Sequence, residues 1–472
     1  MNDYAPTTAF TAETAVASVD ASSTSLLTDM YELTMLQGAL ASGTATRRSV
    51  FELFGRRLPA SRRFGVVAGT GRLLDAIEAF TFTPSQIDFL HRTGVVNDET
   101  LDFLRDYRFT GTVRGYAEGE CYFAGSPLLT VEGTFAEACI LETLALSIYN
   151  YDCAVASAAS RMTIAAHGRP CVDFGARRAH EQAAVAAARA SVVGGFVGTS
   201  NLEAGLLYGI PTVGTSAHSF TLLHDSEEDA FAAQVASLGP STTILVDTYD
   251  IATGVERAVK AARAAGGELG AVRLDSGDLV AEAFKVRAQL DTLGATSTKI
   301  TVTNDLDEHA IAALGAAPVD SYGVGTKLVT GSGRPTAALV YKLVEREGAD
   351  GTMEEVAKFS SGGKSTVGGR KWAGRRLTSE GTAAEELVVS SSSQDQGLAA
   401  LSEAGARPLQ VLLVDEGRII EEHRGKEALS AAAERHRAAR AELPYDAWRL
   451  SDGESALPTR HVDLDGRSAT RR

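Results

Sequence analysis

Short apolar runs alternate with helical stretches through the middle of the chain. Most runs are separated by windows with the helical spacing of apolar residues, such as residues 250–266. This alternation is typical of parallel strands joined by right-handed crossover helices. About seven such units predict an α/β fold, an irregular (β/α) barrel over residues 136–335 that begins with two Ala-rich helices at 137–150 and 154–167. The runs cover residues 171–174, 195–198, 211–214, 243–247, 271–275, 299–303 and 320–325.

The two flanks of this region alternate apolar and polar residues, as antiparallel strands do. On the N-terminal side the pattern covers residues 49–59 and 112–133, after an apolar segment with helical spacing at 26–40. A similar pattern resumes after the last barrel run. Because both flanks share this character, we expect one discontinuous α+β domain, formed by residues 26–135 and completed by about 336–445.

Both ends of the chain are polar. Residues 1–25 are rich in Ala, Ser and Thr, and residues 446–472 are rich in Gly, Asp and Arg. Segments with so few apolar residues bury too little surface to fold by themselves. We therefore expect a disordered lead-in and a polar tail with little structure.

Composition and charge restrict the function. The 45 Lys and Arg against 60 Asp and Glu give a net charge of −15, which argues against non-specific binding to nucleic acid or to an anionic membrane. The sequence has neither an 18-residue apolar run nor a basic leader with an apolar stretch, so we expect no membrane span and no secretion. The four cysteines offer no close pair for zinc and are expected as reduced thiols. These features favour a cytoplasmic enzyme in which local cations hold any anionic ligand.

Reactive side chains follow nearly every apolar run. The loops at the carboxyl ends of barrel strands carry the active site, so these groups should converge on one rim. The segment AVRLDSGDL supplies Arg273, Asp275 and Asp278. Two carboxylates beside a glycine turn can bind vicinal hydroxyls or a hydrated magnesium ion. Asp278 alone is more often the N-cap of a helix, whereas the three residues together favour a functional role.

Two further segments carry groups suited to anions. Residues 321–333, SYGVGTKLVTGSG, form a glycine-rich loop after the last barrel strand, where barrels commonly bind phosphate. FGARRAHE places Arg177 in a pair of arginines near a helix start, where cations oppose the helix dipole and favour an anionic partner. Salt bridges to neighbouring carboxylates explain the pair equally well. Phe174, in the same segment, can stack on an aromatic ring.

Two single residues have competing interpretations. His218 follows a strand in GTSAHSF, and a lone histidine is more often structural than catalytic. Near a phosphate pocket, however, a neutral imidazole can accept a phosphoryl group as a nucleophile. Tyr31, on the first predicted helix, has the spacing of an ordinary core aromatic.

In their order, these segments resemble the nicotinate phosphoribosyltransferase family of type II phosphoribosyltransferases. The resemblance implies transfer of phosphoribose from phosphoribosyl pyrophosphate to nicotinate, giving nicotinate mononucleotide and pyrophosphate for NAD salvage. It also implies ATP as a co-substrate whose hydrolysis is coupled to the transfer, and a requirement for Mg²⁺. It extends from about Leu26 to Arg376 and rests on LLTDMYELTM, FELFGRR, FGARRAHE, GTSNLEAG, GTSAHSF, VDTYD, VRLDSGDL and YGVGTKLVTG.

The resemblance also implies roles for individual residues. His218 matches a histidine that ATP phosphorylates, and Tyr31 and Phe174 match aromatics that sandwich the pyridine ring. Relatives that use nicotinamide have an aspartate where this chain has Ser200, so the acid should be preferred over the amide. The remaining matches are Arg273 at the ring, Arg177 and Thr215 around the substrate, Asp275 and Asp305 near ribose and magnesium, and Gly325 and Thr326 at the 5′-phosphate. Asp278 is expected at the substrate from its own motif.

The resemblance also implies how the subunits assemble, and three other functions remain as alternatives. The family pairs two subunits head to tail, which implies a homodimer in which Tyr31 enters the partner's rim. The nearest alternative is a phosphoribosyltransferase acting on nicotinamide or quinolinate. A sugar-phosphate barrel lyase would need a Schiff-base lysine, but the strands offer only Lys299, at the start of one. A third alternative is a non-catalytic nucleotide-binding regulator.

Overall fold

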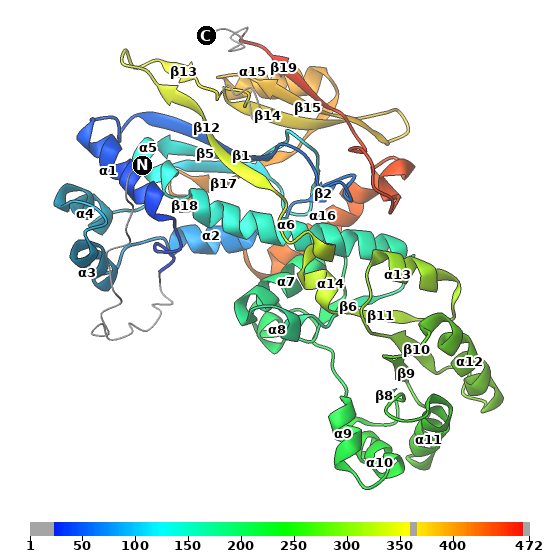
Figure 1. Ribbon diagram of the computed structural model, residues 1–472. Coiled ribbons are helices and arrows are strands. Elements are labelled where there is room, and N and C mark those ends of the chain that lie inside the picture. Colours follow the sequence, from blue (N-terminus) through cyan, green and yellow to red (C-terminus); the bar gives the residue numbers. More distant parts are fainter. Residues whose placement is uncertain (1–22, 359–365, 466–472) are drawn as a thin grey trace, which may run out of the picture.

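A computed structural model describes residues 23–358 and 366–465 of the protein. Antiparallel sheets lie in the upper part of Figure 1 and a parallel sheet lies in the lower part. The long helix α6 (Glu142–Ala165) runs between them. No helix in the described ranges has the length and apolar character needed to cross a membrane.

Strands from both flanks of the chain interleave in a seven-stranded sheet of order β13-β12-β1-β5-β3-β17-β18. The inner strand β1 pairs antiparallel with both β5 and β12. The rings of Phe51 and Tyr341 stack there with their centroids 5.0 Å apart. The chain therefore leaves this sheet after β5 and returns with β12, which confirms the discontinuous α+β domain. The strands are β1 (Arg48–Gly55), β3 (Thr112–Tyr116), β5 (Pro127–Thr134), β12 (Leu339–Glu347), β13 (Met353–Glu355), β17 (Gln410–Asp415) and β18 (Arg418–Ile419).

Six parallel strands form the second large sheet, in the order β7-β6-β11-β10-β9-β8. The predicted α/β class is confirmed. Among the described residues, however, the parallel sheet has six strands instead of the predicted seven or so. The run at 211–214 contributes only a single bridge, between Thr199 and Thr212. The backbone of this run bonds only to β7, where the Thr199 N–H donates to the carbonyl of Pro211 over 3.0 Å. No described strand bridges from the run to β8, so the sheet stays open between β7 and β8. The strands are β6 (Cys171–Asp173), β7 (Gly198–Thr199), β8 (Thr243–Leu245), β9 (Ala271–Leu274), β10 (Lys299–Val302) and β11 (Ser321–Val324).

Helices follow the parallel strands and cover their sheet. Their buried faces are rich in Ala and Val, such as Val255, Ala258 and Val259 of α11, which lets the helices pack closely on the strands. The helices of this region are α7 (Glu181–Val193), α8 (Leu202–Tyr208), α9 (His218–Leu223), α10 (Glu227–Leu238), α11 (Ile251–Ala264), α12 (Leu279–Thr292), α13 (Glu308–Ala313) and α14 (Thr326–Val329).

The N-terminal domain adds shorter elements to its sheet. They surround an apolar core in which Leu36, Leu53, Leu74 and Leu101 are fully buried. These elements are α1 (Met30–Ala41), α2 (Thr70–Glu78), α3 (Pro84–Thr93), α4 (Asp98–Arg105), α5 (Phe135–Cys139), β2 (Gly65–Val66) and β4 (Cys121–Tyr122).

The two Ala-rich helices expected before the first barrel strand are one helix, α6, of 24 residues. Residues 151–153, which include the charged Asp152, lie between the two predicted segments. Asp152 is fully buried and forms an ion pair with Arg72, with 2.6 Å between Nη1 and Oδ1. Because its charge is compensated inside the protein, the helix continues through it.

The ends of the chain are more ordered than their composition predicted. Ser25, assigned to the lead-in, is fully buried and donates a hydrogen bond to Gln86 over 3.0 Å. Residues 446–465 are also folded, because β19 (Thr459–Asp463) pairs parallel with β15 (Ala383–Ser390). The pairing supplies the stabilisation that the polar sequence lacks. The expectations for 1–22 and 466–472 lie outside the described residues.

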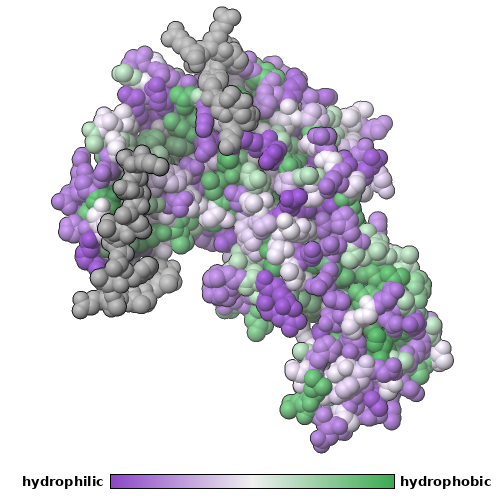
Figure 2. All heavy atoms as spheres, in the orientation of Figure 1, coloured by the Kyte–Doolittle hydropathy of each residue, from purple (hydrophilic) through white to green (hydrophobic). Residues whose placement is uncertain are grey.

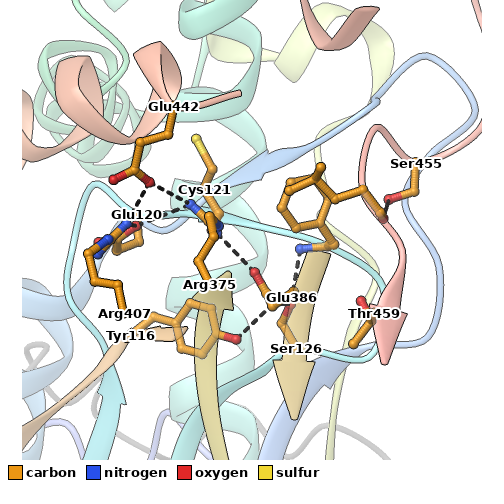
Figure 3. A network of polar contacts seen from close by, with 12 residues as sticks. Tyr116, Glu120, Cys121, Ser126, Arg375, Glu386, Arg407, Glu442, Ser455 and Thr459 are labelled. Carbon is orange, nitrogen blue, oxygen red and sulfur yellow. Dashed lines mark hydrogen bonds and ion pairs between the residues drawn. The ribbon is translucent and has the colours of Figure 1, made fainter. Parts of the chain in front are cut away.

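A four-stranded sheet of order β16-β14-β15-β19 completes the C-terminal part. A buried polar network joins it to the N-terminal domain (Figure 3). Arg375 forms an ion pair with Glu386 at 2.9 Å, and Tyr116 donates a hydrogen bond to Glu386 over 2.8 Å. Buried charges of this kind are tolerated only when they are paired and hydrogen-bonded. The remaining elements are β14 (Lys371–Leu377), β16 (Ala406–Pro408), α15 (Gln394–Glu403) and α16 (Gly425–Ala441).

Candidate active site

A cavity of about 560 Å³ opens at the carboxyl ends of the parallel strands. Its walls come from loops after β6, β7, β9, β10 and β11 and from the segment that precedes α9. The sequence predicted this convergence from the position of polar residues at strand ends. Nine of the predicted site residues line the cavity: Phe174, Arg177, Ser200, Thr215, Arg273, Asp275, Asp305, Gly325 and Thr326.

Arg273 reaches the cavity from β9 with part of its guanidinium unsatisfied. Its Nε is buried and makes no hydrogen bond to any described residue. Burial lowers the pKa of Arg273 below its usual value, and the nearby carboxylates of Asp275 and Asp247 only oppose this shift. A buried guanidinium N–H without a partner favours an anionic acceptor. The site therefore offers a cation to a ligand that enters the cavity.

The loop after β9 is held by carboxylates and hydroxyls of neighbouring loops. Asp275 donates its backbone N–H to Oδ2 of Asp247 over 2.9 Å, and Ser276 donates its hydroxyl to the same oxygen over 2.7 Å. Thr303, which follows β10, donates a hydrogen bond to Oδ1 of Asp275. These contacts fix the position of the Asp275 carboxylate at the rim.

The Phe174 ring lies against Gly323 of β11. A Cβ atom on Gly323 would come within 2.4 Å of the ring, so only glycine leaves it enough room. The neighbouring Asp173 is fully buried and accepts hydrogen bonds from the Gly175 N–H and the Thr199 hydroxyl, both at 2.7 Å. Asp173 thus connects the loop that carries Phe174 to the loop that carries Ser200.

The glycine-rich loop after β11 approaches the Phe174 loop closely. A Cβ atom on Gly175 would lie 3.2 Å from the carbonyl oxygen of Gly325 and 2.2 Å from a methyl group of Val329. Gly325 and Thr326 line the cavity where this loop enters α14. Glycine at position 175 therefore lets the two loops lie close together, with the backbone of Gly325 at the cavity wall, where a phosphate site can use it.

His218 begins α9, immediately after the residues 213–217 that line the cavity. Its Nδ1 lies 3.1 Å from Oγ1 of Thr248, the residue after Asp247. Asp247 in turn binds the loop of Asp275, so the imidazole belongs to the same rim as Arg273. The histidine and the arginine are thus brought to one side of the sheet, although His218 stands at the edge of the cavity.

Two predicted site residues lie elsewhere. Asp278 is exposed at the start of α12, where its carboxylate accepts a hydrogen bond from the Ala281 N–H over 3.2 Å. Its observed contact is therefore the helix cap that the sequence offered as the alternative. Tyr31 lies on α1, 44% exposed, at the opposite end of the molecule from the parallel sheet (Figure 1).

The acidic residues at the rim suit a metal ion that takes further ligands from a substrate. Residues 23–358 and 366–465 hold no cluster of three or more His, Cys, Asp or Glu that could form a complete metal cage. Asp275 and Asp305 line the cavity, and the buried Oδ1 of Asp247 makes no hydrogen bond to any described residue. Mg²⁺ commonly uses one or two carboxylates together with ligand phosphates, which this donor set fits.

Several residues that build the rim were predicted only as polar groups at strand ends, without an individual role. Asp173 and Asp247 end their strand runs, and their position at the boundary between apolar and polar residues was the available signal. Asn304 also lines the cavity and has a φ of 101°, which is rare for a residue other than glycine. The sequence carries no sign of this conformation.

Comparisons with known proteins agree with this architecture. The model of the nicotinate phosphoribosyltransferase N-terminal domain matches residues 26–150, and the model of the nicotinate phosphoribosyltransferase family matches residues 170–361. The chain belongs to the nicotinate phosphoribosyltransferase family. It is 51% identical over 445 residues to a nicotinate phosphoribosyltransferase of Mycobacterium tuberculosis, covering 93% of this chain and 95% of that protein. The Bacillus subtilis nicotinate phosphoribosyltransferase is 38% identical over 356 residues, covering 74% and 72%.

A solved structure supports the same relationship. The crystal structure of human nicotinic acid phosphoribosyltransferase is similar with a TM-score of 0.78 and 25% identity, covering 92% of this chain and 97% of the human one. The human enzyme therefore has both lobes of this fold.

The contact between Phe174 and Gly323 gives a testable prediction. Replacing Gly323 by Ala should push the ring out of place, at a cost of roughly 1–3 kcal/mol for an overpacked contact. We expect kcat/KM for the aromatic substrate to fall about tenfold or more while the protein stays folded. Steady-state kinetics and circular dichroism test this. Gly315→Ala is the matched control, because a Cβ atom there has no neighbour within 4 Å; equal kinetics for the two variants would contradict the prediction.

Proposed function

We propose that the protein transfers phosphoribose from phosphoribosyl pyrophosphate to nicotinate, producing nicotinate mononucleotide and pyrophosphate for NAD salvage. The observation that carries the proposal is that the unpartnered Nε of Arg273 and the Phe174 ring line one cavity together with a glycine-rich loop. A flat heteroaromatic acid needs a ring contact and a cation, and a sugar phosphate needs a phosphate loop. Membership of the family supports the same reaction.

In the proposed reaction the pyridine nitrogen attacks C1 of the ribose as the bond from C1 to the pyrophosphate oxygen breaks. The nitrogen supplies the electron pair and pyrophosphate carries the other pair away, so no proton needs to move. The enzyme must therefore orient the ring and stabilise the leaving charge. Phe174 and Arg273 orient nicotinate, Gly325 and Thr326 hold the 5′-phosphate, and Arg177 offers a cation to the pyrophosphate.

The carboxylates Asp275 and Asp305 face the ribose in this arrangement. They are the residues that would hold Mg²⁺ with the phosphates of the substrate. The ion would supply positive charge to the leaving pyrophosphate. The carboxylates can also accept hydrogen bonds from the ribose hydroxyls.

Ser200 and Thr215 complete the cavity wall without adding negative charge. A hydroxyl at position 200 does not repel the carboxylate of nicotinate, while Arg273 attracts it. Asp173, the carboxylate next to this wall, has both oxygens engaged by Gly175 and Thr199. These contacts support a preference for the acid over the amide.

We further propose that ATP phosphorylates His218 and that this step couples ATP hydrolysis to the transfer. Thr248 binds Nδ1, which leaves Nε2 as the nitrogen that attacks the γ-phosphorus while ADP departs. Later hydrolysis of the phosphoimidazole would return the histidine and release phosphate. The position of His218 at the edge of the cavity supports a role beside the transferred group.

The exposed apolar residues support a homodimer with shared sites. Leu27 and Met30, next to Tyr31, are each 62% exposed, and Figure 2 shows a hydrophobic patch over α9, where Leu222 and Leu223 are 62% and 79% exposed. We propose that α1 of one subunit packs near the rim of its partner. Tyr31 would then supply the second aromatic face opposite the partner's Phe174.

The cysteines support a reducing, cytoplasmic location. All four are buried and unpaired in the structure. Burial raises the pKa of the Cys121 thiol to about 12, so it stays protonated and unreactive. Free thiols of this kind are usual in reducing compartments.

One assay tests the proposed function. The protein is incubated with phosphoribosyl pyrophosphate, Mg²⁺ and nicotinate, nicotinamide or quinolinate, with and without ATP, and the mononucleotide is detected by mass. We expect nicotinate mononucleotide, faster with ATP, and a lower kcat/KM for the other pyridines. Faster turnover of nicotinamide or quinolinate would favour those alternatives. The lyase alternative has no structural support, since Lys299 is exposed at the other end of the strand.

Replacing His218 by Ala should abolish labelling of the protein by ATP that carries a labelled γ-phosphate. Slow phosphoribosyl transfer should remain, because the imidazole takes no part in bond formation at C1. Autoradiography and the mass assay measure the two effects. His224→Ala, which changes the residue directly after the same helix, is the control. Undiminished labelling of the His218 variant would place the phosphorylation elsewhere.

Mixing two variants with impaired sites tests the shared site. Tyr31→Ala should weaken nicotinate binding, and Arg273→Ala should remove the carboxylate partner. If Tyr31 acts across the dimer, random exchange of subunits gives mixed dimers with one intact site and about a quarter of the wild-type activity. Activity after denaturation and joint refolding measures this, and no recovery would count against the shared site.

A further inference from the structure

Glu308 is a buried carboxylate beneath the rim that the proposed chemistry does not use. It is the first residue of α13 and is only 2% exposed. The loop before it carries Asn304 and Asp305 into the cavity. The wall formed by Asn304 and Asp305 therefore leads directly into the helix that Glu308 begins.

The carboxylate is bound by three residues that are distant in the sequence. Arg161 of α6 donates to Oε1 over 2.9 Å, and Nη1 of Arg62 lies 3.6 Å from the same oxygen. The hydroxyl of Ser332 donates to Oε2 over 2.7 Å. Glu308 thus connects the loop before α13 to the end of the glycine-rich loop.

Arg62 and Glu308 also stabilise the end of the glycine-rich loop. Ser332 adopts a left-handed conformation with φ +54°, which costs free energy for a residue other than glycine. Nη2 of Arg62 donates to the carbonyl of the preceding Gly331 over 2.7 Å. The contacts to Arg62 and Glu308 therefore offset the free-energy cost of the left-handed conformation in the turn that follows α14.

The cluster carries an excess of positive charge. Two guanidinium groups, Arg62 and Arg161, share one carboxylate, and all three side chains are 3–5% exposed. Burial lowers the pKa of Arg62 to about 10, despite the nearby Glu308. A buried cation in excess is costly unless an anion lies near. In a chain of net charge −15, this excess lies behind the loops that line the cavity with Asp305, Gly325 and Thr326.

The half of the rim that carries Phe174 and Ser200 is held by a different buried carboxylate. Asp173 connects the loops of Phe174 and Ser200 through its contacts to Gly175 and Thr199. None of the described hydrogen bonds of Asp173 reaches Glu308, Arg62 or Ser332. The loops for the aromatic acid and those for the sugar phosphate thus have different anchors.

We propose that Glu308, with Arg62 and Ser332, is a positioning unit for the sugar-phosphate half of the site. It sets the distance between the loop of Asp305 and the loop of Gly325 and Thr326, and it supplies positive charge behind them. This inference rests on the proposed function, because it assigns phosphoribosyl pyrophosphate to these two loops.

Ser332→Gly is the sharpest test, since glycine accepts the left-handed backbone but removes the hydrogen bond to Glu308. We expect KM and Kd for phosphoribosyl pyrophosphate to rise about threefold to tenfold, with KM for nicotinate unchanged. Glu308→Gln should give a larger rise in the same two constants. Steady-state kinetics, calorimetric titration with phosphoribosyl pyrophosphate and thermal melting are measured for each variant.

Glu386→Gln is the matched control, because Glu386 is also buried and paired with an arginine at 2.9 Å, in the network of Figure 3. It should lower the melting temperature and leave both KM values unchanged. Ser332→Gly keeps the test decisive if Glu308→Gln does not fold. Equal rises in the two KM values, or no change in either, would overturn the positioning role. A wild-type protein that makes no nicotinate mononucleotide would instead refute the proposed function.

Discussion

A buried guanidinium that keeps one N–H unsatisfied is the constraint on which the site depends. Arg273 stands at the end of β9 with Asp275 and Asp247 nearby, yet its Nε has no partner among the described residues. A cation in this state is stable only because the surrounding carboxylates oppose the cost of burial without occupying the N–H. The free N–H is then available to an anionic ligand. The Phe174 ring in the same cavity favours a ligand with a flat face, and the glycine-rich loop provides room for phosphate.

The side chains of the site are held in place by contacts between loops, and not by closure of the parallel sheet. The parallel sheet is open between β7 and β8, so its closure cannot fix the rim. Buried carboxylates join the loops of the rim instead. Asp173 connects the loops after β6 and β7, and Asp247 connects those after β8 and β9. Helix α6 runs between the two lobes and supplies Arg161 to the cluster around Glu308. The two halves of the cavity are thus anchored through different buried carboxylates, and they meet where the Phe174 loop packs against the glycine-rich loop at Gly175.

The sequence predicted the elements that have a local signal. The strands at 171–174, 271–275, 299–303 and 320–325 are apolar runs that end in polar residues, and the structure contains each of them. The same rule brought nine site residues together, since the carboxyl ends of parallel strands share one edge. The sequence did not reveal structural features that depend on pairing between residues far apart in the chain. The continuity of α6 requires the pairing of Asp152 with Arg72, and the order of residues 459–463 requires pairing with β15. Asp278 has the same local sequence whether it caps a helix or binds a ligand, so only its position could decide.

The most direct test of this account is the acid preference of the Arg273→Lys variant. Lysine keeps the positive charge but removes the planar fork that can bind a carboxylate through Nε. We expect the ratio of kcat/KM for nicotinate to that for nicotinamide to fall by about tenfold or more, because the loss affects the acid alone. A ratio equal to that of the wild-type protein would show that the carboxylate is recognised elsewhere and would contradict the account.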